Sequence, residues 1–371
     1  MPPKSPTVAN PFPRKVVEGV PDRPDPAELY AALDLGTNSC RMLIAQPKGN
    51  QFHVVDSFSK SVQLGQGLEA SGRLSRTAMR RTVQALKICR SKIEKHNVKR
   101  MRLVATEACR RAENGPGFLG NVIRDTGLKL EVIKPQEEAR LAVISCAPLV
   151  SPRTDQLLVV DIGGGSTELV WIDMSRVPNI ERPRALMRLN TGFAPDPKSP
   201  FPAAHVVDWI SVPLGVATLR DQFNDVENDA ARFALMSWHF EEHLSEFSPY
   251  GDEQTREGFQ IIGTSGTVTT VAASHLGIRR YDRSKVDGLR MTSDQIDKVI
   301  RDYLDLGPEG RRADPRIGRD RHTLIMSGAA ILQALLRVWP TDRLTVADRG
   351  LREGLLYAQM SADGVLEDGV Y

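Results

Sequence analysis

The residues best suited to chemistry in this sequence belong to a short motif, Asp-x-Gly-x-x-Ser, that occurs twice. The first copy begins at Asp34 and the second at Asp161, and apolar residues flank both. When the copies are aligned, the matched pairs are Asp34 with Asp161, Gly36 with Gly163, Ser39 with Ser166, and Arg41 with Glu168. One such motif alone is as readily explained as a glycine-rich hairpin turn. Two matching copies favour a duplicated site.

The motif has the residue types of an anion-binding loop. Glycines allow backbone N–H groups to point into an open pocket. Hydroxyl donors stand beside those amides at Thr37, Ser39, Ser166 and Thr167. Arg41, two residues after Ser39, offers a bidentate guanidinium to the same anion.

The two aspartates call for a different role, because a carboxylate repels a phosphate. Carboxylates in this position suit Mg²⁺ (or Mn²⁺), held usually through its waters, with the metal bridging to phosphate oxygens. The sequence therefore predicts a metal-assisted phosphate site in which Asp34 and Asp161 are metal ligands.

Strands, turns and helices alternate around both copies. The apolar runs beside each loop predict a strand, a tight turn and a second strand, over 29–46 and again over 156–173. The other expected elements are strands at 52–58, 101–106, 128–134 and 344–348, helices at 75–96, 136–147, 214–247 and 350–360, and a strand–turn–helix unit at 260–273. This alternation predicts an α/β fold with two similar domains and a site in the cleft between them.

The composition is that of a soluble globular protein, with 371 residues, 41% hydrophobic and 26% charged. Its four cysteines are widely separated, which favours free thiols in a reducing cytoplasm over a disulfide framework. No run approaches roughly 18 apolar residues, so no membrane-spanning segment is predicted. Residues 1–27 are proline-rich and are expected to form a disordered leader outside the fold.

Positive charge is concentrated in one segment. Thirteen Lys and Arg residues and only two Glu residues occur between Arg73 and Arg111, although the net charge of the chain is +3. This segment is either a solvated helix face or an attractive field for a polyanion. Few aromatic residues are interleaved with these charges, so nucleic-acid binding is not expected.

Six short motifs along the chain form a recognisable series. They are Asp34-Leu-Gly-Thr-Asn-Ser-Cys-Arg41, Leu64-Gly-Gln-Gly-Leu68, Ala105-Thr-Glu-Ala-Cys-Arg-Arg-Ala-Glu-Asn114, Glu137-Glu-Ala-Arg140, Asp161-Ile-Gly-Gly-Gly-Ser-Thr-Glu168 and Gly263-Thr-Ser-Gly-Thr267. In order and spacing, over residues 29–360, the series resembles the exopolyphosphatase/guanosine pentaphosphate phosphatase family, in its short two-domain form.

The resemblance implies a fold and a domain division. The fold would be two actin-like (ribonuclease H-like) domains of the acetate kinase, sugar kinase, Hsp70 and actin superfamily, with an interdomain cleft. Domain I is expected at 28–136 plus about 358–371, and domain II at 137–357. Two stretches depart from the family pattern: 318–323 reads Gly-Arg-Asp-Arg-His-Thr in place of Gly-Arg-Ala-Asp, and the loop at 179–202 is inserted.

The resemblance also assigns catalytic roles. Glu138 is expected to orient or deprotonate the attacking water, and its neighbour Glu137 to be a solvated charge. Glu168 is expected to be a second catalytic carboxylate that shares the metal with Asp161 and Asp34.

Phosphate contacts follow from the same resemblance. Arg110 is expected to contact phosphate, and Arg111 to be a surface charge. The full set of expected phosphate-binding residues is Gly36, Thr37, Asn38, Ser39, Arg41, Arg110, Gly163, Gly164, Gly165, Ser166, Thr167, Gly263, Thr264, Ser265, Gly266 and Thr267.

The expected function is metal-dependent hydrolysis of the terminal phosphate of inorganic polyphosphate, which releases orthophosphate. Guanosine pentaphosphate is an alternative substrate of the same class, and guanosine tetraphosphate a candidate ligand. Two other functions stay open: a polyphosphate:nucleotide phosphotransferase, in which ADP replaces water, and a non-catalytic sensor of alarmone or polyphosphate. The oligomeric state also stays open, with a homodimer as one option.

Overall fold

The computed structural model describes residues 28–193, 204–249, 258–318 and 321–366, and the predicted leader at 1–27 lies outside them. The strands are β1 (Tyr30–Leu35), β2 (Ser39–Lys48), β3 (Gln51–Ser61), β4 (Arg100–Ala105), β5 (Glu131–Val132), β6 (Gln156–Ile162), β7 (Thr167–Asp173), β8 (His205–Val212), β9 (Phe259–Thr264), β10 (Arg290–Met291) and β11 (Leu344–Ala347). The α-helices are α1 (Leu68–Ser71), α2 (Arg76–Lys95), α3 (Glu107–Arg111), α4 (Gly115–Thr126), α5 (Pro135–Cys146), α6 (Arg182–Met187), α7 (Val216–Gln222), α8 (Asp229–Leu244), α9 (Gly266–His275), α10 (Arg283–Val286), α11 (Ser293–Ala313), α12 (Ile325–Val338) and α13 (Leu351–Ala362). Short 3-10 helices are η1 (Ala147–Leu149), η2 (Asn179–Glu181) and η3 (Thr191–Phe193).

Two mixed sheets share one strand order. The first runs β3-β2-β1-β4-β5 and the second runs β8-β7-β6-β9-β11, with the short β10 added at its far edge. In each sheet the first three strands in chain order are antiparallel neighbours. Two later strands run parallel to the first of them: β4 and β5 in the first sheet, and β9 and β11 in the second. The predicted α/β fold of two similar halves is therefore confirmed.

The repeat extends to the register of single residues. Asp34 lies opposite Arg41 in the β1–β2 hairpin, and Asp161 lies opposite Glu168 in the β6–β7 hairpin. Residues directly opposite on antiparallel strands share one face of the sheet. Each hairpin therefore places an aspartate beside a second charged residue close to its turn.

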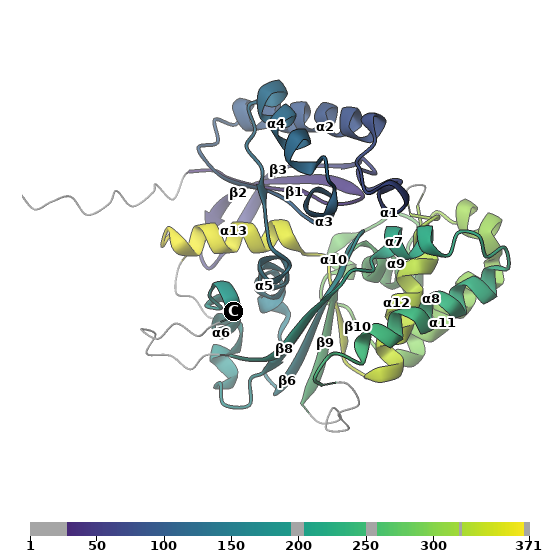
Figure 1. Cartoon of the computed structure of the whole chain (residues 1–371). Helices are drawn as coiled ribbons and strands as arrows, with labels where there is room; N and C mark the ends of the chain where they lie inside the picture. Colours follow the sequence, from purple (N-terminus) through teal and green to yellow (C-terminus); the bar gives the residue numbers. More distant parts are fainter. Residues whose placement is uncertain (1–27, 194–203, 250–257, 319–320, 367–371) are drawn as a thin grey trace, which may run out of the picture.

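The helices lie in layers outside and between the two sheets (Figure 1). α2 and α4 cover the outer face of the first sheet, where Leu33, Leu86 and Phe118 form part of one core. α13 covers its other face and lies against α5. α5 in turn packs on the second sheet through Ala139 and Val143. The helix that carries Glu138 and Glu137 is thus held between the halves.

Local sequence features explain where these helices begin. The Ser75 hydroxyl accepts a hydrogen bond from the Ala78 N–H at 3.2 Å and caps α2. Pro135 occupies the first turn of α5, where its missing N–H and fixed φ cost nothing.

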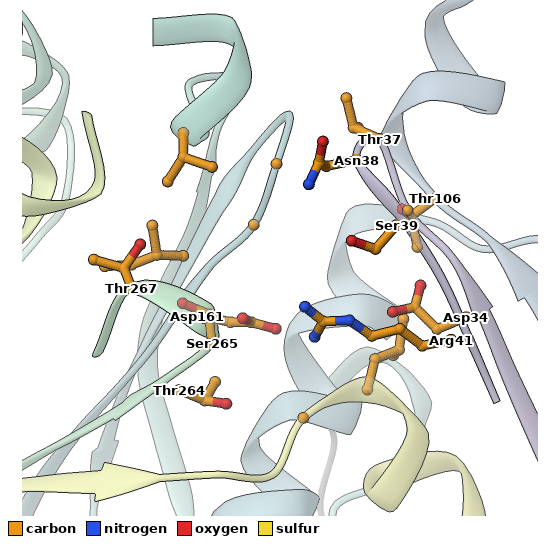
Figure 2. Close-up of a pocket in the computed structure, with 18 of the residues that line it drawn as sticks. Asp34, Thr37, Asn38, Ser39, Arg41, Thr106, Asp161, Thr264, Ser265 and Thr267 are labelled. Atoms are coloured by element: carbon orange, nitrogen blue, oxygen red, sulfur yellow. The ribbon is translucent and has the colours of Figure 1, made fainter. Parts of the chain in front are cut away.

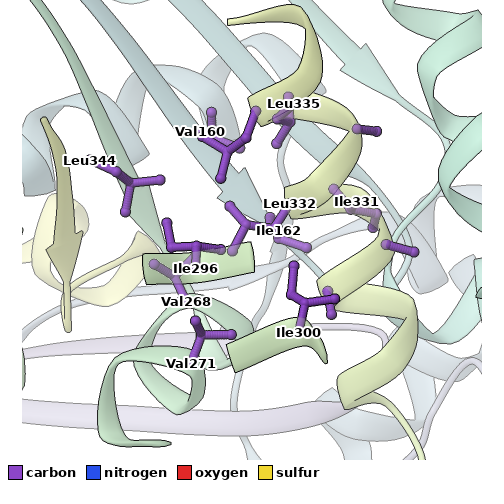
Figure 3. Close-up of a cluster of buried hydrophobic side chains, with 14 of the residues drawn as sticks. Val160, Ile162, Val268, Val271, Ile296, Ile300, Ile331, Leu332, Leu335 and Leu344 are labelled. Atoms are coloured by element: carbon purple, nitrogen blue, oxygen red, sulfur yellow. The ribbon is translucent and has the colours of Figure 1, made fainter. Parts of the chain in front are cut away.

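An apolar core fixes the strand and the helix that reach the cleft from the second half (Figure 3). Val160 and Ile162 of β6 pack with Val268 and Val271 of α9, and α11, α12 and β11 complete the cluster. Because Asp161 is the penultimate residue of β6 and α9 begins directly after Ser265, this core sets the position of the turns that follow β6 and precede α9.

Three expectations about local structure need correction. The sequence does not predict β8, an edge strand whose conformation depends on pairing with β7. The strand expected at 128–134 is only Glu131–Val132. The segment expected as a loop at 179–202 contains η2, α6 and η3 up to residue 193, and its remainder lies outside the described residues. Arg182 anchors α6, because its buried guanidinium donates to the carbonyl groups of Val177 and Pro152.

Both predicted domain boundaries fall inside helices. The boundary at 136/137 lies within α5, and the one near 358 lies within α13, whose residues Leu351 to Met360 pack on the first sheet. The two halves are therefore joined by helices that lie between them. None of the helices in the described ranges is long and apolar enough to cross a bilayer.

Candidate active site

Each copy of the motif forms a turn that is closed by the same hydrogen bond. The Gly36 N–H donates to the Ser39 carbonyl at 3.0 Å, and the Gly163 N–H donates to the Ser166 carbonyl at 2.9 Å. Other carbonyl groups of the turns accept hydrogen bonds from backbone N–H groups of neighbouring segments. The Asn38 carbonyl accepts from Val62 and Gln63, the Gly163 carbonyl from Val216, and the Gly164 carbonyl from Ala217. With these acceptors satisfied, the turns offer N–H and O–H donors to a ligand, which suits an anion.

The two turns meet between the halves. A Cβ atom added to Gly164 would lie 3.2 Å from the Cβ of Thr37, and one added to Gly165 would lie 2.6 Å from the Oγ1 of Thr37. Glycine is needed at both positions because two backbones approach closely there. The Thr37 hydroxyl oxygen is buried and has no hydrogen-bond partner among the described residues. A phosphate oxygen would satisfy it.

A cavity of about 640 Å³ lies between the halves, a size typical of ligand sites. Most residues predicted from the sequence line its wall: Asp34, Gly36, Thr37, Asn38, Ser39, Arg41, Glu138, Asp161, Gly163, Gly164, Ser166, Thr264, Ser265, Gly266 and Thr267. Figure 2 shows Arg41 reaching across this space from the first half toward Asp161 and Ser265.

The turn before α9 is strained at a non-glycine residue. Ser265 has φ 104° and ψ 177°, a region that is almost exclusive to glycine and costs about 1–3 kcal/mol. Its Oγ is buried without a partner among the described residues. This strained turn presents a free hydroxyl and a helix N-terminus to the cavity, and both favour an anion.

Five predicted residues do not line the wall. They are Gly165, Thr167, Glu168, Arg110 and Gly263. Thr167 is fully buried and its hydroxyl donates to the Leu214 carbonyl at 2.7 Å. Gly263 lies inside β9 against Val268. The side chain of Thr167 and the strand position of Gly263 therefore support the turns rather than contact a ligand.

Four carboxyl groups, two buried and two half-buried, gather around the cavity: Glu138, Glu168, Asp34 and Asp161. Glu168 is 2% exposed and Glu138 is 9% exposed. Burial raises the pKa of Asp34, and burial with the charge of Asp34 raises the pKa of Asp161 to about 6. Burial and the charge of Asp161 raise the pKa of Glu168 to about 8, and burial with the charge of Glu168 holds the pKa of Glu138 well above its usual range. This crowding would be relieved by a cation.

The donor chemistry of this cluster fits Mg²⁺ or Mn²⁺, although no ready cage exists. Among the described residues, no group of three or more His, Cys, Asp or Glu side chains is placed to hold a metal ion. Mg²⁺ does not need one, because it is usually bound through one or two carboxylates, waters and substrate phosphates. Asp34 and Asp161, which line the cavity, supply hard oxygen ligands of that kind, whereas Glu168 lies off the wall.

Glu138 and Glu137 have different surroundings on α5. Glu138 lines the cavity. Glu137 instead accepts from Arg102 at 2.9 Å and from Arg140 at 2.8 Å. Its side chain is only 12% exposed, so the expectation that Glu137 is a solvated charge is wrong.

Arg110 lies behind Glu138 and not on the cavity wall. Its Nη1 lies 3.3 Å from Glu138 Oε2 and donates to the Ile133 carbonyl at 2.8 Å, while Nη2 bonds to Glu107. In this arrangement Arg110 contacts Glu138 and not the cavity wall, and its contact with phosphate stays a prediction. Arg111, expected at the surface, pairs with Glu69 at 2.5 Å.

Comparison with known proteins identifies the family. Residues 43–363 match the model of the Ppx/GppA phosphatase family. The chain belongs to this family. Among solved structures, the Aquifex aeolicus member of the Ppx/GppA family is similar, with 29% identity, a TM-score of 0.70, and coverage of 91% of this chain and 98% of that one. An exopolyphosphatase-like protein shares 26% identity with a TM-score of 0.74, over 90% of this chain and 99% of that one.

A third structure is similar in fold. An exopolyphosphatase from Cytophaga hutchinsonii has 21% identity and a TM-score of 0.72, over 92% of this chain and 100% of that one. The resemblance predicted from six motifs is thus confirmed over nearly the whole described chain.

Several wall residues of this Ppx/GppA family member were not predicted from the sequence. Arg349 lies in the turn between β11 and α13, and Arg352 lies in the first turn of α13. Thr106 lies in the turn between β4 and α3, and Glu107 is the first residue of α3. Both turns follow strands that run parallel to the strands carrying the aspartates. Polar residues directly after a parallel strand are the signal that would have found them.

The basic segment 73–111 does not surround the cleft. Its long helix, α2, lies on the outer face of the first half (Figure 1). Seven Lys and Arg residues of the segment 73–111 form ion pairs: Arg73, Arg90, Lys92, Arg100, Arg102, Arg110 and Arg111. The position and the ion pairs of the segment 73–111 therefore favour a solvated, partly neutralised surface over a field that attracts a polyanion to the site.

Proposed function

We propose that this protein is an exopolyphosphatase that hydrolyses the terminal phosphate of inorganic polyphosphate with the help of Mg²⁺ or Mn²⁺. The observation that carries the proposal is that one cavity combines three donor-rich turns with the carboxyl groups of Asp34, Glu138 and Asp161 on its wall. Phosphoanhydride hydrolysis needs charge neutralisation, positioning and one base. The similarity to an exopolyphosphatase-like protein supports the same reaction.

The turns would hold the terminal phosphate. The Thr37 hydroxyl has no hydrogen-bond partner in the described part of the chain, and Ser166 and Ser39 line the same wall. Donors fixed in this way are oriented before the ligand arrives, so they stabilise the charge that develops on the transferring phosphoryl group.

Glu138 would act as the base. It accepts a proton from a water molecule as the water oxygen bonds to the terminal phosphorus and the anhydride P–O bond breaks, which leaves orthophosphate and a chain shortened by one phosphate. Its raised pKa makes it a stronger base than an ordinary carboxylate. Arg110, anchored by Glu107 and the Ile133 carbonyl, fixes the direction of the Glu138 carboxylate.

Asp161 and Asp34, which line the cavity, would hold the divalent ion, and Glu168, opposite Asp161 in the β6–β7 hairpin, would contact it through its waters. Such an ion supplies positive charge to the phosphate oxygens. The Ser211 hydroxyl donates to Glu168 Oε1 at 2.9 Å and orients that ligand.

Substitution of the two adjacent glutamates tests the proposal. Glu138→Gln is expected to lower kcat for tripolyphosphate by about 10²- to 10⁴-fold with little change in KM. Glu137→Gln, the matched control, is expected to keep kcat within a few-fold, because that carboxylate is tied to two arginines outside the cavity wall. Equal losses in both variants, or none in Glu138→Gln, would refute the assignment.

The substrate and the reaction class need separate assays. Orthophosphate release from tripolyphosphate, long polyphosphate and guanosine pentaphosphate would be measured with Mg²⁺, with Mn²⁺ and with EDTA. We expect activity only with metal. ATP formation from ADP and polyphosphate that outpaces phosphate release would instead establish a phosphotransferase, and binding without turnover would establish a sensor.

A further inference from the structure

The motif Leu64-Gly-Gln-Gly-Leu68 lies outside the cavity wall, and its place in the fold indicates another role. Most of it belongs to the loop 62–67, which directly follows β3. Three backbone N–H groups of this loop donate to the carbonyl groups of Thr37 and Asn38, over distances of 2.8 to 2.9 Å. The loop therefore supports the first turn from behind.

The second turn is supported in the same way, by the segment that follows β8. There the Val216 N–H donates to the Gly163 carbonyl at 2.9 Å, and the Ala217 N–H donates to the Gly164 carbonyl at 2.8 Å. β3 and β8 are the third strands of their sheets in chain order, so the two supports occupy equivalent places in the repeat. They also meet between the halves, because α1, which directly follows the loop 62–67, contacts α7 (Figure 1). Support of the turn is thus a feature of both halves.

The two supports differ in what fixes their own backbone. Val216 and Ala217 are the first residues of α7, so a helix holds them. The loop 62–67 has no regular secondary structure. Within it Gln63 has φ 47°, a left-handed conformation that is unfavourable for a residue with a Cβ atom. Such a backbone persists only where its surroundings hold it.

Arg81 of α2 provides that hold. Its guanidinium donates to the Val62 carbonyl at 3.0 Å, to the Gln63 carbonyl at 3.3 Å and to the side-chain oxygen of Gln66 at 3.3 Å. All three acceptors are uncharged and all belong to the loop 62–67. A guanidinium suits this task because its N–H groups are fixed in one plane, whereas the ammonium of a lysine is a single flexible point charge.

We propose that Arg81 is a positioning residue for the hydrolysis: it fixes the loop 62–67, and the loop fixes the turn that carries Thr37 and Asn38. This inference rests on the proposed function. Arg81 lies outside the cavity wall and would act only through the loop. The loop also packs directly on the turn, since a Cβ atom added to Gly65 would overlap the Thr37 side chain. A displaced loop would therefore displace the Thr37 hydroxyl, and a shift of about 1 Å in such a donor costs about a hundredfold in rate.

The kinetic test compares two adjacent arginines. Arg80, the matched control, is exposed on α2. With tripolyphosphate and Mg²⁺, we expect Arg81→Ala to lower kcat by about ten- to a hundredfold and to change KM less than about threefold, because fixed donors act on the transition state. Arg80→Ala should keep both within about twofold. Arg81→Lys keeps the charge but not the planar group, so it should recover little of the loss; full recovery would show a charge effect and overturn positioning.

A double-mutant cycle tests whether the effect passes through the turn. Arg81→Ala and Thr37→Ala would be combined, with urea unfolding curves to choose conditions in which every variant is folded. If Arg81 acts through the Thr37 turn, the double variant should lose clearly less kcat than the product of the two single losses. Losses that multiply, or a loss in Arg81→Ala that only follows the unfolded fraction, would overturn the proposal.

Amide hydrogen exchange provides a readout that does not depend on activity. Arg81→Ala should speed exchange of the Val62 and Gln63 N–H groups at least about tenfold, and Arg80→Ala should not. Unchanged exchange would overturn the hold of Arg81 on the loop. Faster exchange with kcat within twofold of the wild type would overturn the positioning role while the proposed function stands. A wild-type protein that releases no phosphate would overturn the proposed function, and faster exchange in Arg81→Ala would still support the hold on the loop.

Discussion

Gly165→Ala is expected to separate the two halves of the site without unfolding either. The added Cβ would lie 2.6 Å from Thr37 Oγ1 and 3.0 Å from the Cγ of Glu107, whereas ordinary contacts begin at 3.4 Å. The larger overlap, about 0.8 Å, arises between the halves and not inside either core. It is therefore most easily relieved by moving the two turns apart.

The size of the effect follows from that displacement. Overpacking of this kind costs roughly 1–3 kcal/mol of stability, which a domain pair with two intact cores tolerates. A shift approaching 1 Å between catalytic groups costs about a hundredfold in rate. We therefore expect kcat/KM for tripolyphosphate to fall by about two orders of magnitude while cooperative unfolding persists.

The assay pairs phosphate release with urea unfolding, and Gly120→Ala is the control. Gly120 lies on the exposed side of α4, and a Cβ there meets nothing within 4 Å. That variant should keep full activity and gain about 0.5–1 kcal/mol from helix propensity. Activity of Gly165→Ala within twofold of the wild type, or loss of folding altogether, would show that the contact between the turns does not set the geometry of the site.

Two further substitutions test other parts of the account. Ser265→Gly is expected to raise the free energy of unfolding by about 1 kcal/mol, because it removes the backbone strain at φ 104°. The same change is expected to lower kcat/KM several-fold, because the hydroxyl is lost. A variant less stable than the wild type would show that Ser265 is not strained. Asp56 has its pKa lowered to about 2, chiefly by its hydrogen bond with Lys92 and also by one with His96. Because the pKa of Asp56 in the folded protein lies below the ordinary 3.8, the stabilisation that the Asp56 carboxylate provides is fully present above about pH 4. It is lost as the pH falls through about 2. Asp56→Asn should therefore be about 1 kcal/mol less stable than wild type at pH 7, with the difference vanishing near pH 2 in acid unfolding curves; a constant difference across that range would refute the assignment.

The turns could be predicted from the sequence because their conformation is local. Glycines at fixed offsets, flanked by apolar runs, specify a strand, a turn and a strand whatever surrounds them. The hydrogen bonds from Gly36 to Ser39 and from Gly163 to Ser166 repeat as the sequence repeats. The alternation of strands and helices likewise predicted the α/β class, because hydrophobic periodicity is a property of each segment by itself.

The tertiary structure decided what depends on long-range packing. It placed Arg110 behind Glu138, bound Glu137 to Arg102 and Arg140, and brought Arg352 into the cavity from the other end of the chain. It also put the basic helix α2 on the outer face, away from the cleft. A charged side chain carries no local signal of the partner it will meet. The sequence by itself therefore determined which turns are suited to an anion, and only the packing of the two halves determined which charges face them.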